Sequence, residues 1–169
     1  MGVRRWRLFM IDPIGRAAQN PDLMLPPEQF KKMMDYIVSN RAEGTIITSF
    51  GCDGFLGDYE AFVREGLFFC RAGIHVGSVL ANGDICACPN INRGWVQGNI
   101  YKDDFLDVWE NNFKEFRNHK TFKTGMCGDC EMWKWCRGEG MHLREPGNPD
   151  PLKCHYHQLY PEEKNKSLR

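Results

Sequence analysis

The chain has 169 residues, a length that suits one ordinary domain or one domain with a small fragment attached. Its 22 basic residues equal its 22 acidic residues, so no net charge attracts nucleic acid, and we expect no nucleic-acid partner. No apolar run approaches the roughly 18 residues of a membrane span, and the N-terminus lacks the apolar stretch of a signal peptide. We therefore expect a cytoplasmic location, where the eight cysteines bind a metal or a cluster rather than form disulfides.

Residues 1–50 follow the order strand, helix, strand. Aromatic and aliphatic residues mix over 5–11 and predict a buried strand. Pro26 suits the start of a helix and Gly44 its end, and a second strand is predicted over 45–50. The apolar residues of this helix repeat with helical spacing, at Phe30, Met33, Met34, Ile37 and Val38. This order is typical of a parallel βαβ unit, which alone cannot cover both faces of its strands, so we expect a piece of a longer protein.

Beyond this unit the chain is rich in glycine and cysteine, which predicts many loops. A short helix is expected over 59–64. Gly83, preceded by asparagine, favours a tight turn, so 74–80 and 84–87 are predicted to form a β-hairpin. Asp104 is a suitable cap for a helix with an apolar stripe. We interpret that stripe as packing rather than as a cofactor site; it comprises Phe105, Val108, Trp109, Phe113 and Phe116.

The strongest site signal is the group Cys127-x2-Cys130-x5-Cys136, followed by Cys154. Two cysteines separated by two residues can point at one metal from a tight turn, and two more complete a shell of four thiolates. Four thiolates suit zinc as well as an iron–sulfur cluster. The spacing alone leaves both open.

A second group of cysteines lies upstream, at Cys52, Cys70, Cys86 and Cys88. The predicted hairpin turn at Gly83 brings the chain back, so Cys70 and Cys88 are expected near the base of the hairpin. Taken with the first group, the pattern Cys70-x12-Gly83-x4-Cys88 resembles the SPASM domain. That domain is the auxiliary-cluster module that ends many radical S-adenosylmethionine (SAM) enzymes acting on peptides and proteins.

The resemblance covers Cys70 to Cys154. Upstream, Trp6-Arg7-Leu8 and the run Pro13-Ile14-Gly15-Arg16-Ala17 are similar to the last strand of the radical SAM partial barrel. The implied fold is α+β: a short βαβ remnant of that barrel, followed by a loop-rich domain with a β-hairpin, a helix and cysteine-ligated sites. The implied domains are a barrel remnant over 1–50, a SPASM domain over 51–161 and a frayed tail over 162–169.

The resemblance also implies the cofactors, which are one or two [4Fe-4S] clusters. Cys127, Cys130, Cys136 and Cys154 would hold the distal cluster, whereas Cys70 and Cys88 belong to the second. The family places a cysteine four residues after the one matching Cys136, and Gly140 stands there in this chain. Cys52 and Cys86 are the candidates to replace the lost ligand; otherwise an iron would be open to solvent, to His142 or to substrate. Gly15 and Arg16 are weaker candidates for contact with the cofactor at the barrel edge.

The Cys-x3-Cys-x2-Cys loop that binds the SAM cluster does not occur in this sequence, so the chain alone is not expected to cleave SAM. A missing N-terminal barrel would supply that loop and bind SAM in the intact parent. The expected function is auxiliary-cluster binding in an oxidoreductase or maturase, serving the binding of a peptide or protein substrate and electron transfer. The alternative is a zinc-stapled structural or protein-binding module without a redox role. Zinc is also expected to fill vacant thiolates in protein prepared in air.

Overall fold

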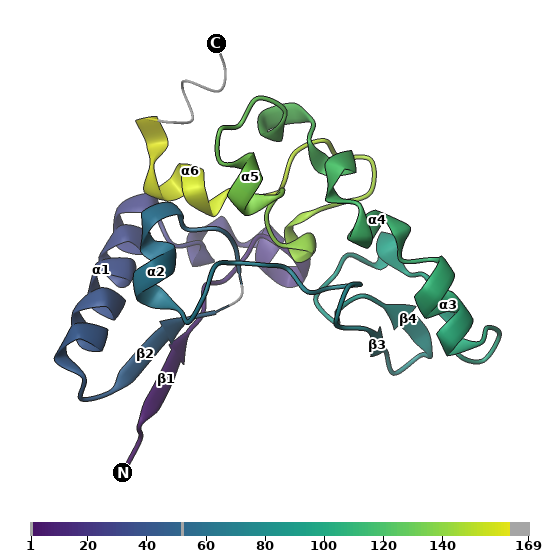
Figure 1. The fold of residues 1–169 in the computed structure, drawn as a ribbon, viewed down its shortest axis with the longest axis horizontal. Coiled ribbons are helices and arrows are strands. Elements are labelled where there is room, and N and C mark those ends of the chain that lie inside the picture. The colour runs from purple at the N-terminus through teal and green to yellow at the C-terminus, as the bar shows by residue number, and fades with distance from the viewer. Residues whose placement is uncertain (1, 52, 163–169) are drawn as a thin grey trace. The chain divides into compact units, whose positions relative to one another are not determined.

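The structure, a computed structural model, describes residues 2–51 and 53–162. The chain divides into two compact units. The first comprises Met1–Phe69 and Lys153–Arg169, and the second comprises Cys70–Leu152. The second unit is thus inserted, in sequence, between two segments of the first. Helices and small sheets occur together, which confirms the predicted α+β class (Figure 1).

The first unit is built on the predicted βαβ element. Strands β1 (Arg5–Leu8) and β2 (Ile47–Phe50) pair in parallel, and helix α1 (Pro27–Glu43) connects them. Pro27 occupies the first turn of α1, where its missing N–H costs nothing. Gly44 ends the helix with φ of 74°, a left-handed conformation that glycine adopts without strain. The parallel pairing confirms the order predicted for residues 1–50.

The core of the first unit lies between α1, β2 and two short helices, α2 (Glu60–Val63) and α6 (His155–Leu159). The predicted stripe of α1 supplies three of its seven buried side chains. The buried side chains are Phe30, Met34, Ile37, Phe50, Leu56, Val63 and Leu159. The prediction of a buried first strand is wrong: β1 is largely exposed, because within the described residues it pairs with β2 alone.

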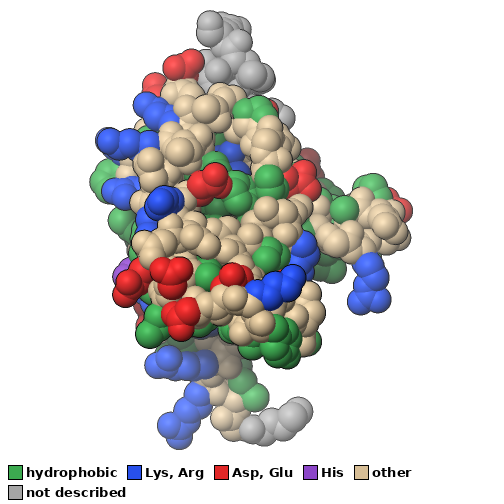
Figure 2. Space-filling model, turned by 90° about the vertical axis from the view of Figure 1, so that its right-hand side faces the viewer, with side chains coloured by type: hydrophobic (Ala, Val, Ile, Leu, Met, Phe, Trp, Pro, Cys, Tyr) green, Lys and Arg blue, Asp and Glu red, His purple; other side chains and the backbone are tan. Residues whose placement is uncertain are grey.

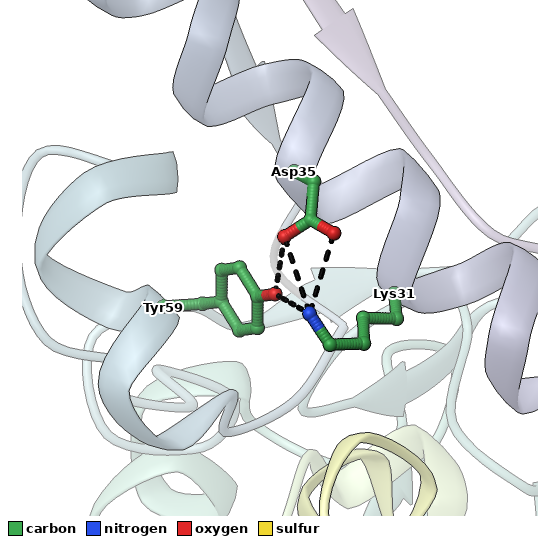
Figure 3. Close-up of polar contacts among 3 residues, drawn as sticks. All are labelled: Lys31, Asp35 and Tyr59. Atoms are coloured by element: carbon green, nitrogen blue, oxygen red, sulfur yellow. Dashed lines mark hydrogen bonds and ion pairs between the residues drawn. The ribbon is translucent and has the colours of Figure 1, made fainter.

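A polar network joins α1 to the turn that precedes α2 (Figure 3). Lys31 Nζ lies 2.9 Å from the hydroxyl of Tyr59 and 3.3 Å from a carboxylate oxygen of Asp35. The Tyr59 hydroxyl donates in turn to Asp35 at 2.5 Å. These three side chains line a pocket of about 560 Å³ together with apolar residues of α2 and of the segment around Leu159.

The second unit contains the predicted β-hairpin. Strands β3 (Ser78–Val79) and β4 (Asp84–Cys86) are antiparallel, and β5 (Gly98–Asn99) adds a third strand that the sequence did not predict. Gly83 has φ of 86°, and its N–H donates to the carbonyl of Leu80 at 2.9 Å. The hairpin is therefore confirmed, with the expected turn.

The helix predicted after Asp104 is present but interrupted. Asp104 caps α3 (Phe105–Asn111) by accepting the N–H of Asp107 at 2.9 Å. The backbone leaves helical geometry at Phe113, and α4 (Lys114–Arg117) follows as a separate turn. Near the end of this unit lies α5 (Trp133–Cys136). Short 3-10 turns in the described loops are Gly15–Gln19, Pro21–Leu23, Gly57–Tyr59, Arg93–Trp95, His119–Phe122, Gly125–Cys127 and Met141–Leu143.

The aromatic stripe packs into the core of the second unit, which supports its interpretation as packing. Val108, Phe113 and Phe116 are at most 2% exposed. The core cluster comprises Ala72, Ile85, Ala87, Ile91, Trp95, Val108, Phe113, Phe116, Phe122 and Met141. Cys70 and Cys88 pack against this cluster, so the apolar core positions cysteines of the second group.

Charges of both signs are interspersed on the face drawn in Figure 2, in keeping with the balanced composition. Over the described residues, none of the helices combines the length and the hydrophobicity that a membrane span requires.

Candidate metal centre

The predicted ligands are distributed over both units. Six cysteines lie in the second unit, whereas Cys154 immediately precedes α6 in the first. Cys52 lies outside the described residues. The structure records no disulfide among the seven cysteines that it describes, which fits the expectation of thiol ligands.

The Cys127–Cys130 pair lies on a loop that is fixed by a carboxylate. A 3-10 turn ends at Cys127, and Asp150 accepts the N–H of Met126 at 2.6 Å. The carbonyl of Cys130 then accepts the N–H of Trp133, the first residue of α5, which ends at Cys136. The local structure thus explains why the spacing places these cysteines on consecutive turns.

Burial raises the pKa of the Cys127 thiol. The positive charge and hydrogen bond of Arg144 oppose this effect, whereas the nearby Cys130 and Glu139 add to it. A bound metal would instead lower the pKa of the Cys127 thiol, because coordination favours the thiolate.

Three cysteine sulfurs accept hydrogen bonds from nitrogen. Arg144 Nη2 lies 3.1 Å from Cys127 Sγ, and the backbone N–H of Glu139 lies 3.2 Å from Cys136 Sγ. The backbone N–H of Met141 lies 3.4 Å from Cys70 Sγ. Such N–H···S contacts tune iron–sulfur clusters, and they suit thiolates in general.

Gly140 stands between the last two of these donors. The N–H before it, from Glu139, points at Cys136, and the N–H after it, from Met141, points at Cys70. One short loop therefore touches a cysteine of each predicted group. The position where a ligand is missing relative to the family lies beside Cys70.

Cys86 and Cys88 lie at the end of the hairpin. Cys86 is fully buried on β4, opposite Ser78. Its thiol pKa is raised by burial, opposed by the charge and hydrogen bond of Arg93, and raised slightly by Cys88. Cys86 and Cys88 are separated in the sequence by Ala87 alone.

The described cysteine sulfurs do not form a tight group of three or more. No three described cysteine sulfurs lie within 4.8 Å of one another. For comparison, a tetrahedral zinc with Zn–S of about 2.3 Å spaces its sulfurs by roughly 4 Å.

Gly15 and Arg16 lie in the first unit, on an exposed 3-10 turn. The neighbouring Asp12 is buried and forms an ion pair with Lys153, at 3.0 Å. The sequence did not predict this pair. His155 and His157 are also buried in the first unit.

Sequence reasoning also missed Arg144 and Glu139, which are 0% and 1% exposed. Both are charged residues in a loop rich in glycine and proline, where charged side chains are normally solvated. The only available signal was their position between Cys136 and Cys154. That position does not indicate burial.

The sequence is similar to one protein-family model and to two curated enzymes. The sequence model of the SPASM family, an iron–sulfur cluster-binding domain, matches residues 70–131. The chain is 26% identical over 192 aligned residues to an AdoMet-dependent heme synthase of Nitratidesulfovibrio vulgaris, covering 92% of this chain and 47% of that protein. It is 22% identical to the enzyme of the same name from Oleidesulfovibrio alaskensis, covering 92% of this chain and 45% of that protein.

Solved structures show the same fold. Native anSMEcpe with bound AdoMet and Cp18Cys peptide has a TM-score of 0.51 and 20% identity, covering 94% of this chain and 46% of that one. Native anSMEcpe with bound AdoMet has a TM-score of 0.50 and 19% identity, covering 87% of this chain and 42% of that one. The chain spans about half the length of the curated relatives that it matches.

Residues 70–131, a loop-rich part of the chain with hydrogen-bonded cysteine sulfurs, match the model of an iron–sulfur cluster-binding domain. This match agrees with the resemblance to the SPASM domain that the cysteine spacing predicted.

Proposed function

We propose that the chain binds an auxiliary [4Fe-4S] cluster through Cys127, Cys130, Cys136 and Cys154. The observation that carries this proposal is the set of N–H···S hydrogen bonds to Cys127, Cys136 and Cys70, in a unit that matches the SPASM family. A cluster bound there supplies a site of one-electron oxidation and reduction. The residues around it hold the sulfurs in place and exclude water.

Cys70 and Cys88 are proposed ligands of a second cluster, with Cys86 or Cys52 as a third. Cys86 is near Cys88, which supports Cys86 as the replacement for the family cysteine at Gly140. Cys70, beside the Gly140 loop, completes the group. This site has fewer proposed ligands than the distal site, so an iron there would be open to His142 or to substrate.

The parent protein is proposed to be a radical SAM enzyme with a barrel that precedes this chain. The relatives are about twice as long as the matched region, which supports a further domain. The proposed division is a barrel remnant over 1–50 and a SPASM domain over 51–161. Thiols that ligate a cluster are maintained in a reducing compartment, and we propose the cytoplasm.

The proposed substrate is a peptide or protein, with the cluster assisting substrate binding and electron transfer. The solved relative with a bound peptide supports this class. A tetrapyrrole is the second candidate, because the curated relatives are named AdoMet-dependent heme synthases. Titration of the cluster-loaded chain with a cysteine-containing peptide or with a porphyrin separates the two, since the true substrate class should perturb the cluster's electron paramagnetic resonance (EPR) spectrum.

Metal and sulfide analysis of the chain, produced and reconstituted without oxygen, tests cluster binding. We expect iron and acid-labile sulfide together with broad visible absorption. Protein that contains zinc, but no iron or sulfide, would instead establish the zinc-stapled module. Zinc in protein prepared in air does not decide between them, because oxygen strips labile clusters.

Two single substitutions test the assignment of ligands to two sites. Cys130→Ala should abolish the distal cluster and leave the second, whereas Cys88→Ala should do the reverse. Each variant should lose a different EPR signal. Loss of the same signal in both variants would refute the two-site assignment.

A further inference from the structure

Arg144 follows the 3-10 turn Met141–Leu143 and is fully buried. Its Nε donates to the carbonyl of Gly138 at 2.9 Å, and its Nη1 donates to the carbonyl of Pro149 at 2.9 Å. Its Nη2 donates to Cys127 Sγ at 3.1 Å. One guanidinium thus links three segments of the second unit: the backbone at Gly138, the backbone at Pro149 and the sulfur of Cys127.

The groups to which this guanidinium donates are uncharged in the absence of a metal: two carbonyls and the Cys127 thiol. The guanidinium lies 5.4 Å from the centre of the Phe122 ring, and the Nε1–H of Trp95 donates to the Arg144 carbonyl at 3.2 Å. Two carbonyl groups and an aromatic ring do not neutralise a buried positive charge. The sulfur of Cys127 becomes an anionic partner when it binds iron, and the hydrogen bond is then charge-assisted.

The loop is shaped to let the guanidinium approach. Gly138 adopts φ of 97°, and a Cβ at this position would lie 3.1 Å from Arg144 Nη2. Glycine is therefore required there for two reasons, the backbone conformation and the space.

We propose that Arg144 sets the reduction potential of the distal cluster, as a buried positive charge hydrogen-bonded to the Cys127 ligand. This inference rests on the proposed cluster binding. Reduction adds a negative charge to the cluster, and a cation in a medium of low dielectric stabilises that reduced form. Arg144 should therefore raise the potential.

Glu139 provides a charge of opposite sign in the same region. It is 1% exposed, its N–H donates to Cys136 Sγ, and its charge opposes that of Arg144 at Cys127. A change at Glu139 should therefore move the potential in the opposite direction to a change at Arg144. Disruption of the loop alone would not produce opposite shifts.

The test is an EPR-monitored redox titration of the reconstituted chain, following the signal that Cys130→Ala removes. Arg144→Gln should lower the equilibrium constant for one-electron reduction by about tenfold, which equals 59 mV. Arg144→Lys, which keeps the charge, should lower this equilibrium constant less. Glu139→Gln should raise the constant.

Arg117→Gln is the matched control in the same unit. Arg117 also donates to backbone carbonyls, of Gly73 at 3.1 Å and Glu110 at 3.0 Å, and its guanidinium lies 4.9 Å from the Trp109 ring centre. Its partners are carbonyls and aromatic rings rather than a sulfur. The potential should therefore match that of the wild type.

The proposal is overturned if Arg144→Gln retains the cluster with an unchanged potential, or if Arg144→Gln and Glu139→Gln shift it in the same direction. If Arg144→Gln does not bind the cluster, the Arg144→Lys and Glu139→Gln variants decide the question. A raised potential in Glu139→Gln with a smaller, downward shift in Arg144→Lys supports the proposal, and any other result refutes it. Wild-type protein without iron would instead refute the proposed cluster binding itself.

Discussion

Lys153 and Asp12 form a buried ion pair beside Cys154, with both side chains 7% exposed. The same Asp12 oxygen lies 3.8 Å from His155 Nε2. Lys153→Met should lower the free energy of unfolding by up to about 3–5 kcal/mol, because it removes the nearer of the two basic groups beside the buried Asp12 carboxylate. Urea unfolding measures this loss. The double variant Lys153→Met with Asp12→Asn should recover part of it, and equal losses in the single and double variants would contradict the explanation.

The cysteines could be identified as candidate ligands from the sequence, whereas the charged residues beside them could not. The spacing from Cys127 to Cys136 is local, and it reports directly on turns that can present sulfurs to one centre. Arg144 reaches Cys127 only because the chain between them folds back. Lys153 and Asp12 come from distant parts of the sequence. Side-chain contacts of this kind depend on tertiary structure, which a single sequence does not reveal.

At the scale of elements, the network of Lys31, Asp35 and Tyr59 links α1 to the turn before α2 (Figure 3). Burial raises the pKa of Tyr59, and its hydrogen bond to Asp35 acts in the same direction. The pKa of Lys31 is also raised, first by its hydrogen bond to Tyr59. Because both pKa values are raised by folding, the stabilisation is present below the ordinary pKa of about 10 and is lost as the pH rises through the folded-state values.

Asp35→Asn should therefore lower the pKa of Tyr59, because it removes a carboxylate that opposes formation of the tyrosinate. Ultraviolet titration of tyrosinate measures the change. Glu28→Gln, in the first turn of the same helix, is the control and should leave the Tyr59 titration unaltered. A Tyr59 pKa that stays constant in Asp35→Asn would show that the network does not control it.

Elements with strong periodicity were predicted well, and short elements were not. The stripe from Phe30 to Val38 correctly identified α1 and its buried face. The strand at Gly98–Asn99 contains no apolar residue, so it forms through pairing with β4 rather than through its own preference. The interruption of the helix at Phe113 was also not predicted, because the helical spacing of apolar residues continues through this position. The Phe113 ring packs into the core of the second unit.

At the scale of the whole molecule, the proposed distal ligands are divided between the units, because Cys154 belongs to the first and the other three belong to the second. A cluster ligated by Cys154 would restrain the backbone at the start of α6. Loading should then slow hydrogen exchange at the amides of α6, which begins directly after Cys154. Hydrogen exchange with mass spectrometry, on loaded and cluster-free protein, measures the effect.

Cys154→Ser is the matched variant for this measurement. It should remove the protection of α6 by loading while leaving exchange in the loaded second site unaffected. Protection of α6 that persists in Cys154→Ser, or that never appears in the wild type, would contradict a ligand role for Cys154.

The order of the two units along the chain has a consequence for folding. Leu159 of α6 packs with Phe30 and Met34 of α1, although the entire second unit is translated between them. Most of the partners of α1 in this core, on β2 and α2, follow it closely in sequence, whereas α6 closes the core from far along the chain. Contacts of such large sequence separation are costly to form early, so we expect α6 to join the core late in folding.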